Sequence, residues 1–285
     1  MLSVAKHDDS KLNQLQRDLP EGLVVDSVWL TERGYSTSLR THYVSAGWLE
    51  RVARRVYRRP RGTLTWQQVV ISLQAVMQLP LVVGGRTALD LQGLSHYLSD
   101  GVREVHLYGP DKAPTWLNEL RLGVRFCSHN SRRLFRNDPI VRDVSSVDWN
   151  IDTDQGKSAD PIHGSFRYLP VGHWEWPLTV STPERAILEL MDELPNRESF
   201  HQVDKLMEGL PNLSPRRLQK LLVDCRSVKV KRLFFFYAHR HRHRWLGQID
   251  MKTIDLGAGN RSLVKGGKFN AQFKITLPED LDGVQ

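Results

Sequence analysis

The sequence predicts an α+β protein, in which an N-terminal winged helix-turn-helix is followed by a larger mixed α/β domain. Three observations support this fold class. Residues 19–61 contain two short helical patterns followed by two strand-forming segments. Residues 33–62 concentrate arginine, and beyond Gly62 apolar strand-like segments alternate with capped helices. We therefore divide the chain into a first domain at 1–62 and a second at 63–285.

The composition is that of an ordinary globular protein, with 285 residues, of which 40% are hydrophobic and 25% charged. The N-terminal residues lack the apolar run of a signal peptide, and no window approaches the roughly 18 apolar residues of a membrane helix. We therefore expect a cytoplasmic protein with no membrane partner. Cys127 and Cys225 have no C-x-x-C spacing, which predicts two buried thiols rather than a disulfide or a zinc site.

The N-terminal segment predicts two helices. Leu12, Leu15 and Leu19 recur at helical spacing, which indicates a supporting helix over residues 10–19. Asp26 can cap a second helix through residues 28–30, and Gly34 can end it in the left-handed conformation that glycine tolerates.

A third helix begins after Ser36, which can cap it, and ends at Gly47. Leu39, Tyr43 and Ala46 form its apolar side. The opposite side is small and polar, so its backbone can approach a DNA major groove, where an arginine can bond a guanine or a phosphate. The predicted recognition residues are Ser36, Thr37, Ser38, Arg40 and Thr41. Taken alone, this helix is equally compatible with a solvent-exposed face that binds nothing.

The next segment predicts a basic two-stranded wing with a tight tip at Arg54 and Arg55. Strand-forming residues flank this tip, namely Leu49, Val52, Val56 and Tyr57. Residues 33–62 hold eight arginines, no lysine and one acidic residue, Glu50, so they carry +7 where the whole chain carries +8. The arginines predicted to lie against the DNA backbone are Arg51, Arg54, Arg55, Arg58 and Arg59. Helix and wing together predict binding to double-stranded DNA.

Three stretches of the sequence also resemble a known family. The run GYSTSLRTHYVSAGWLERVARRVY resembles the N-terminal winged helix of the AbiEi antitoxins, which belong to AbiE-type (type IV) toxin–antitoxin systems. STPERAILELMDELP and IDLGAGNRSLVKGGKFNAQFKITLPEDL are similar to stretches of the family's C-terminal domain. The resemblance extends over residues 20–61, 80–109, 164–195 and 230–280. The sequence departs from it at the wing tip, where Arg55 stands in place of an expected glycine.

The resemblance implies two activities and two partners. An AbiEi antitoxin represses its own operon by binding inverted repeats in the promoter, and it counteracts a nucleotidyltransferase-type toxin. Antitoxins of this type are generally described as acting without a tight complex with the toxin. The double-stranded DNA of its own promoter and a cognate nucleotidyltransferase toxin are therefore the expected partners.

Beyond Gly62, the pattern predicts alternating strands and helices. Thr63 or Thr65 can cap a helix through Met77, and Pro183 can begin a helix to residue 194, with Ser181 and Glu184 as its capping box. The other predicted helices cover 86–94, 215–225 and 231–245. The predicted strands cover 81–83, 102–110, 120–126, 141–151, 166–169, 178–180 and 273–277, with turns at 137–139, 160–161 and 266–268.

The segment from 216 to 244 predicts a second basic patch, because it holds ten lysines and arginines and one acidic residue, Asp224. Its candidate contacts are Arg216, Arg217, Lys220, Arg240, Arg242 and Arg244. Such a patch can follow the phosphates of bent DNA or of RNA. A solvated helical surface is the alternative. Residues 234–237 are four consecutive aromatic residues, which predicts core packing, and Trp174 and Trp176 are expected to pack on the sheet.

No catalytic residue, metal ligand or cofactor is predicted. The turn at Gly84 and Gly85 is similar to a nucleotidyltransferase turn, but the next strand offers Glu104 without the second carboxylate that metal-dependent transfer needs. Asp152 and Asp154 alternate, yet a solvated loop explains them as well. His239 and His243 stand at metal-ligand spacing among arginines that would oppose a dication. A stand-alone winged-helix transcription factor with a sensory second domain, and a degenerate nucleotidyltransferase-like enzyme, remain the alternatives to a DNA-binding antitoxin.

Overall fold

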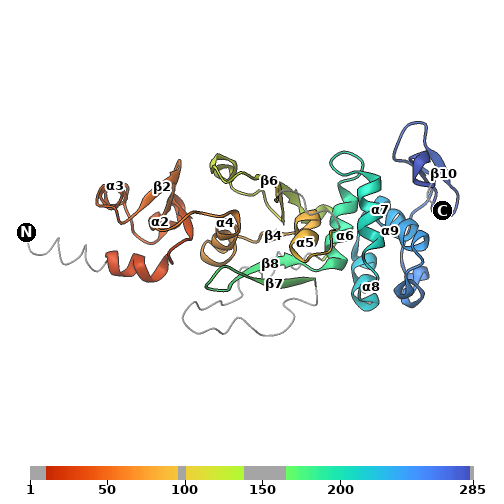
Figure 1. Ribbon diagram of the computed structural model, residues 1–285, viewed down its shortest axis with the longest axis horizontal. Helices are drawn as coiled ribbons and strands as arrows, with labels where there is room; N and C mark the ends of the chain where they lie inside the picture. Colours follow the sequence, from red (N-terminus) through yellow and green to blue (C-terminus); the bar gives the residue numbers. More distant parts are fainter. Residues whose placement is uncertain (1–10, 96–100, 138–164, 283–285) are drawn as a thin grey trace, which may run out of the picture.

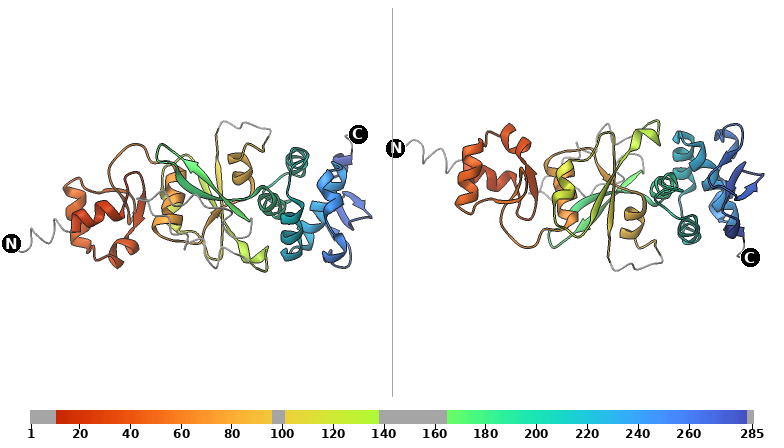
Figure 2. Two further views of the ribbon diagram at one scale, coloured as in Figure 1. Left: turned by 90° about the horizontal axis from the view of Figure 1, so that it is seen from below. Right: turned by 90° about the horizontal axis from the view of Figure 1, so that it is seen from above.

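The computed structural model describes residues 11–95, 101–137 and 165–282. The molecule is elongated, and its first and last described segments lie at opposite ends of its long axis (Figure 1). A winged helix, a five-stranded sheet and a group of helices follow one another along that axis (Figure 2). The predicted α+β fold class is confirmed, with an N-terminal domain followed by a larger mixed C-terminal domain.

The winged helix contains a supporting helix at 11–18 and the elements β1 (Val24–Asp26), α2 (Ser27–Glu32), α3 (Thr37–Ser45), β2 (Glu50–Ala53) and β3 (Val56–Arg58). Asp26 caps α2 as predicted, because its side chain accepts a hydrogen bond from the Trp29 N–H. Gly34 adopts the predicted left-handed conformation after α2, with φ +80°. The three strands pair antiparallel in the order β1-β3-β2. Strand β1 was not predicted, and it anchors the wing to the residues before α2.

The winged helix packs directly on the next elements, α4 (Trp66–Ile71) and the π-helical turn η1 (Ser72–Val76). Thr65 is the residue that caps α4, and it forms a capping box with Gln68. The Val24 N–H donates to the Ser72 hydroxyl at 2.9 Å, and the Trp29 indole N–H donates to the Val76 carbonyl at 3.0 Å. One hydrophobic core therefore continues across residue 62, and the proposed boundary at Gly62 stays a prediction.

The central sheet is mixed and has the strand order β6-β5-β4-β8-β7. Its strands are β4 (Val82–Val83), β5 (Glu104–Gly109), β6 (Arg125–Asn130), β7 (Phe166–Val171) and β8 (Trp176–Ser181), with α5 (Gly85–Leu91) after β4. The strand predicted at 120–126 is wrong in position. The 3₁₀ turn η2 (Thr115–Glu119) and Gly123, with φ +71°, delay the strand until Arg125. The strand predicted at 141–151, most of the turn at 137–139 and the turn at 160–161 lie outside the described residues.

Four helices cover one end of the sheet: α6 (Pro183–Asp192), α7 (Phe200–Glu208), α8 (Pro215–Asp224) and α9 (Val228–Arg240). Helix α7 was not predicted. The capping box predicted for Ser181 and Glu184 is wrong, because Thr182 is the N-cap of α6 and makes no side-chain cap. Glu184 instead accepts hydrogen bonds from the Ser214 N–H at 2.7 Å and from Arg217 at 3.0 Å, so it ties α6 to the start of α8.

Helix α9 begins three residues before the predicted start, because Ser227 caps it, and it ends at Arg240 rather than at 245. Arg242 lies just beyond its end with φ +50°. The consecutive aromatic residues at 234–237 are buried as predicted. Three short 3₁₀ turns, η6 (Arg244–Gln248), η7 (Met251–Thr253) and η8 (Glu279–Asp282), lie in the C-terminal segment, and η3 (Ser131–Arg133) follows β6.

A small sheet closes the chain, with β9 (Arg261–Ser262), β10 (Lys268–Asn270) and β11 (Ile275–Leu277) in the order β10-β11-β9. The predicted turn near Gly266 exists, but it joins two strands that do not pair, so it is not a hairpin turn. Trp176 is buried as predicted, whereas Trp174 is 73% exposed in the loop between β7 and β8, which corrects its expected packing. Within the described residues, no helix has the length and apolarity to cross a membrane.

Candidate nucleic-acid interface

The exposed face of α3 carries small polar side chains. Ser36 caps the helix as predicted, because its hydroxyl accepts from the Leu39 N–H at 3.2 Å. Four of the predicted recognition residues are exposed, namely Ser36, Thr37, Ser38 and Thr41. The sequence analysis missed His42 and Ser45, which extend the same face by another turn. Their spacing of four and seven residues from Ser38 carried that signal.

Arg40 does not lie on that face. Its side chain is buried, with 7% of the residue exposed. The guanidinium donates to the Ser27 carbonyl at 2.7 Å, the Thr31 hydroxyl at 3.0 Å and the Thr37 hydroxyl at 2.8 Å. The expectation that Arg40 is exposed is therefore wrong, because the carbonyl and hydroxyl groups of α2 capture it. A direct contact of Arg40 with DNA stays untested, and it would require these hydrogen bonds to break.

Tyr35 packs against Tyr43 of α3. The residue is buried, its ring lies 6.4 Å from the ring of Tyr43 between centroids, and its hydroxyl donates to the Lys11 carbonyl at 3.2 Å. Burial, reinforced by the charge of Asp18, raises the pKa of Tyr35 to about 12. The phenol therefore remains a neutral donor at neutral pH, and it joins the supporting helix to the residues that precede α3.

The wing tip consists of Arg54 and Arg55, as predicted, and it lies close to the start of α2. Arg55 adopts φ +62°, the left-handed conformation that glycine favours. Its carbonyl accepts from the Ser27 N–H at 2.8 Å, so the tip is bonded to the first residue of α2. The side chains of Arg51, Arg54 and Arg55 are exposed. The wing therefore presents three exposed cations, and its tip is bonded to the start of α2.

Arg58 and Arg59 are engaged within the protein. Arg58 is buried and pairs with Glu50 at 2.8 Å. Arg59 donates to the Leu19 carbonyl at 3.3 Å and pairs with Glu21 at 3.0 Å. The expectation that both guanidinium groups are available to phosphates is therefore corrected, since internal acceptors hold them. Sequence could not separate them from the three exposed arginines, because their partners lie on β2 and on the segment before β1.

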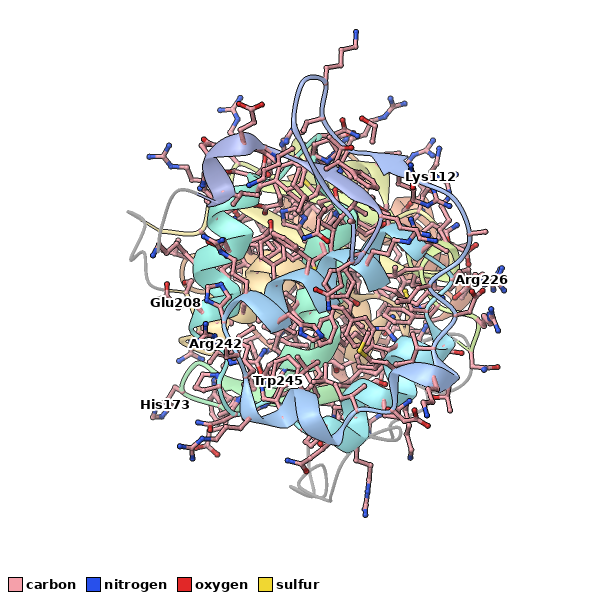
Figure 3. The ribbon with its side chains drawn as sticks, turned by 90° about the vertical axis from the view of Figure 1, so that its right-hand side faces the viewer. Lys112, His173, Glu208, Arg226, Arg242 and Trp245 are labelled. Carbon is pink, nitrogen blue, oxygen red and sulfur yellow. The ribbon has the colours of Figure 1, made fainter. Side chains whose placement is uncertain are left out.

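The basic residues of 216–244 also fall into two groups, those that pair with acidic side chains and those that are exposed. Arg217 pairs with Glu184 at 3.0 Å, and Arg240 pairs with Asp204 at 3.1 Å. The exposed candidates are Arg216, Lys220, Arg242 and Arg244. In Figure 3, Arg226 and Arg242 lie on opposite sides of the C-terminal end, so these two cations do not belong to one patch. Binding of nucleic acid there stays a prediction.

The Gly84-Gly85 turn binds a side-chain carboxylate of the protein itself, that of Glu189. The Gly85 N–H, at the start of α5, donates to the Glu189 carboxylate at 2.9 Å. A Cβ atom on Gly84 would lie only 2.3 Å from the same carboxylate. Glu189 is fully buried and pairs with Arg185 at 2.7 Å, although burial raises the pKa of Glu189 above its usual range. A phosphate would need the position that this carboxylate occupies.

A chain of polar side chains crosses β5 and β6 farther along the sheet. The His106 Nδ1 lies 2.9 Å from the His129 Nε2, and the His129 Nδ1 lies 2.9 Å from a Glu193 carboxylate oxygen. The Tyr108 ring stacks on the His129 ring with 4.5 Å between centroids. Burial, together with the neighbouring His129 ring, lowers the pKa of His106 to about 4. His106 is therefore neutral at pH 7.

Comparisons with family models and with solved structures give matches for most of the chain. Residues 8–100 match the family described as transcriptional regulator, AbiEi antitoxin N-terminal domain. Residues 102–278 match the family described as transcriptional regulator, AbiEi antitoxin, type IV toxin–antitoxin system. No curated protein matches the chain. A crystal structure of the Rv2827c protein from Mycobacterium tuberculosis is similar with a TM-score of 0.54 and 14% identity, over 93% of this chain and 88% of that one. At this identity the likeness concerns the fold alone.

Proposed function

Because the chain belongs to the AbiEi family of transcriptional regulators and antitoxins of type IV toxin–antitoxin systems, we propose that it represses its own operon through inverted repeats in the promoter. We also propose that it counteracts a nucleotidyltransferase-type toxin. Membership in a family of regulators implies DNA as a partner, and membership among antitoxins implies a cognate toxin.

The observation that carries the DNA-binding proposal is the joint exposure of one polar helix face and one cationic tip. The exposed serine and threonine side chains of α3 are short, so the helix backbone can approach base edges in a major groove. The guanidinium groups of Arg51, Arg54 and Arg55 stand free of acidic partners among the described ion pairs. They suit the phosphates beside that groove, which fix register and supply affinity without specifying sequence.

Arg40 has a different role in this proposal. Two of its hydrogen bonds, to Ser27 and Thr31, join α3 to α2, and the third, to Thr37, lies within α3. They hold the recognition helix in place on α2. Specificity then comes from the serines, threonines and His42, while Arg40 determines where they stand.

The first test removes the three exposed wing arginines together. In the Arg51→Ala, Arg54→Ala, Arg55→Ala variant, binding to operator and to unrelated DNA should weaken by similar factors. The slope of log K against log salt should fall by about 0.9 for each phosphate that is no longer neutralised, so by up to about 3. Fluorescence anisotropy over a salt series measures both quantities.

The matched control removes three exposed arginines elsewhere, at Arg132, Arg133 and Arg136. These follow β6, and they lie beside the 216–244 segment because Phe135 pairs with Cys225 between α8 and α9. The control therefore also reports whether that basic segment binds DNA. Their replacement by alanine lowers the net charge equally, but should leave the salt slope within error. Equal decreases in affinity in the two triple variants would mean that overall charge, rather than the wing, drives binding, and would contradict the proposed interface.

A further inference from the structure

Strands β5 and β6 bring three different metal-ligand types to one face of the central sheet. The two strands are parallel, with Glu104 opposite Arg125, His106 opposite Cys127 and Tyr108 opposite His129. Because side chains alternate between the faces of a strand, these six residues share one face. One carboxylate oxygen of Glu104, one ring nitrogen of His106 and the Cys127 sulfur all lie within 4.8 Å of one another.

We propose that Glu104, His106 and Cys127 form a binding site for a zinc ion. Carboxylate oxygen, imidazole nitrogen and thiolate sulfur are the three ligand types that zinc takes in proteins, at about 2.0 to 2.3 Å. A tetrahedral site at those bond lengths separates its ligand atoms by about 3.5 Å. The ligand atoms must therefore close by roughly 1 Å. Glu104 can make that movement, because 42% of its side chain is exposed.

The hydrogen bonds around His106 orient it for a metal. A Glu193 oxygen accepts from the His129 Nδ1–H, which leaves the Nε2 of a neutral His129 to accept from the His106 Nδ1–H. The lone pair of His106 is then on Nε2, the nitrogen that lies 3.7 Å from the Glu104 carboxylate. A histidine that ligates a metal through one nitrogen characteristically donates its other N–H in this way. The hydrogen bonds that join His106, His129 and Glu193 can therefore stay in place when the ion binds.

Arg125, on the neighbouring strand, binds the other carboxylate oxygen of Glu104. The Arg125 Nε donates to that oxygen at 2.9 Å, so the oxygen that faces His106 is the one without this hydrogen bond. Arg125 also contacts Cys127, where its charge opposes a cation. Burial and the charge of Glu104 raise the pKa of the Cys127 thiol, and the charge of Arg125 offsets only part of that rise. Two anionic ligands, the carboxylate and the thiolate, offset the charge of the ion, and Glu193 adds a third negative charge at the end of the histidine chain. The Cys127 thiol proton passes to solvent when the zinc–sulfur bond forms.

Three protein ligands leave one tetrahedral position open, as zinc sites that bind water or a small molecule do. Beside Glu104 and His106 is a cavity of about 290 Å³ that Arg86, Arg103 and Arg197 also line. It gives the ion an entry path and room for a water molecule in the fourth position. Arg86 is itself paired with Glu198 across the cavity wall.

The histidines of 239–243 are a weaker candidate in the same domain. The His241 Nε2 is bonded to Asp204 at 2.7 Å, and the His243 Nε2 to the Met207 carbonyl at 2.7 Å. These two nitrogens already have partners, in contrast to the Nε2 of His106. Cys225, the other cysteine, lies beside the Ser227 carbonyl and belongs to no ligand cluster among the described residues.

Metal binding to the full-length protein tests the proposal. Equilibrium dialysis with Zn²⁺ alone should give one ion per chain, and Co²⁺ in its place should produce a sulfur-to-cobalt charge-transfer absorption. Cys127→Ser should abolish that absorption, whereas the matched Cys225→Ser variant should keep it. Glu104→Gln, at an exposed position, should weaken zinc binding, and His129→Ala should weaken it 10- to 100-fold because His106 is no longer oriented.

Far-ultraviolet circular dichroism checks that each variant is folded. Absence of stoichiometric zinc in the wild-type protein would overturn the proposal, as would bound cobalt without the charge-transfer absorption. Persistence of the absorption in Cys127→Ser, or loss of zinc in a His239→Ala, His241→Ala variant with Glu104→Gln unaffected, would place the ion elsewhere and equally overturn it. DNA binding has no part in these measurements, so they stand apart from the proposed function.

Discussion

Arg40 and Arg54 differ in their surroundings, although both belong to the winged helix. Arg40 is buried and donates to three oxygens of α2 and α3, whereas Arg54 is exposed at the wing tip. Arg40→Ala should lower the free energy of unfolding by about 1–3 kcal/mol, because it removes the three hydrogen bonds of a buried charged group. Arg54→Ala should change it by less than about 0.5 kcal/mol, as surface substitutions do. Urea unfolding followed by circular dichroism measures both.

The same pair of variants decides whether Arg40 contacts a base. If Arg40→Ala retained full stability and lost only its preference for operator over unrelated DNA, the arginine would contact DNA directly. The proposed role of Arg40 in positioning α3 would then be wrong, and the prediction from the sequence that Arg40 contacts DNA would hold.

The position of Arg40 could not be inferred from helical periodicity. On α3 it stands three residues before Tyr43 and one after Leu39, at the border between the buried and exposed sides. A side chain at this border can turn toward a neighbouring element that provides hydrogen-bond acceptors. Here α2 provides a carbonyl and a hydroxyl group. By contrast, Ser36, Thr37, Ser38 and Thr41 lie clear of that border, and their exposure was predicted correctly.

At the scale of elements, the wing turn combines a backbone requirement with a charge. Arg55 has φ +62°, a conformation that costs an L-residue about 1–2 kcal/mol relative to glycine. Arg55→Gly and Arg55→Ala remove the same charge, so both should weaken DNA binding equally. Only the glycine relieves the backbone, and its variant should be more stable than the alanine variant by about 1 kcal/mol. Thermal unfolding and anisotropy titrations of the pair separate the two effects.

Equal stability of the two Arg55 variants would mean that the turn changes conformation when the arginine is removed. Unequal DNA affinity would show that the shape of the turn, as well as its charge, contributes to binding.

The turn into α5 allows a sharper test of packing. A Cβ atom at Gly84 would lie 2.3 Å from the Glu189 carboxylate and 2.5 Å from the Tyr108 ring. Gly84→Ala should therefore cost about 1–3 kcal/mol, the range for an overpacked core. Gly247 has an ordinary backbone and no atom within 4 Å of such a Cβ, so Gly247→Ala should be nearly neutral. Chemical denaturation compares them, and a stable Gly84→Ala would indicate a turn able to open for a ligand.

Capped helices and the tight wing were predictable because their signals are local. Ser36 caps the helix that the sequence assigns to it, and Thr65 is the one of the two predicted candidates that caps α4. The start of β6 and the partner of Glu184 were not predictable, since a turn at Gly123 and the distant Ser214 decide them. The zinc-ligand cluster was missed for the same reason. Glu104 and His106 alternate on one strand, but only strand pairing brings Cys127 beside them.

For the whole molecule, the central question is whether repression and toxin neutralisation can be separated. The winged helix shares its core and two hydrogen bonds with η1, so a truncated chain would expose apolar surface. The full-length Arg51→Ala, Arg54→Ala, Arg55→Ala variant avoids this. With the toxin expressed from an unrelated promoter, this variant should protect cells as well as the wild-type chain does, and colony counts measure that protection.

Loss of protection in this folded variant would mean that neutralisation requires the DNA-binding surface. Failure of the wild-type chain itself to protect under the unrelated promoter would mean that the antitoxin acts through repression alone.

The bonds of β1 and α2 to η1, together with Gly22 packed against the Trp176 ring of β8, have a consequence for the operator. They couple the orientation of the recognition helix to that of the elongated body behind it. Two copies bound to inverted half-sites would then project their bodies at an angle that the DNA helical repeat determines. Inserting about 5 base pairs, half a turn, between the half-sites would move one body to the opposite side of the duplex. Binding by two copies would thus depend on the spacing between the half-sites as well as on their sequence.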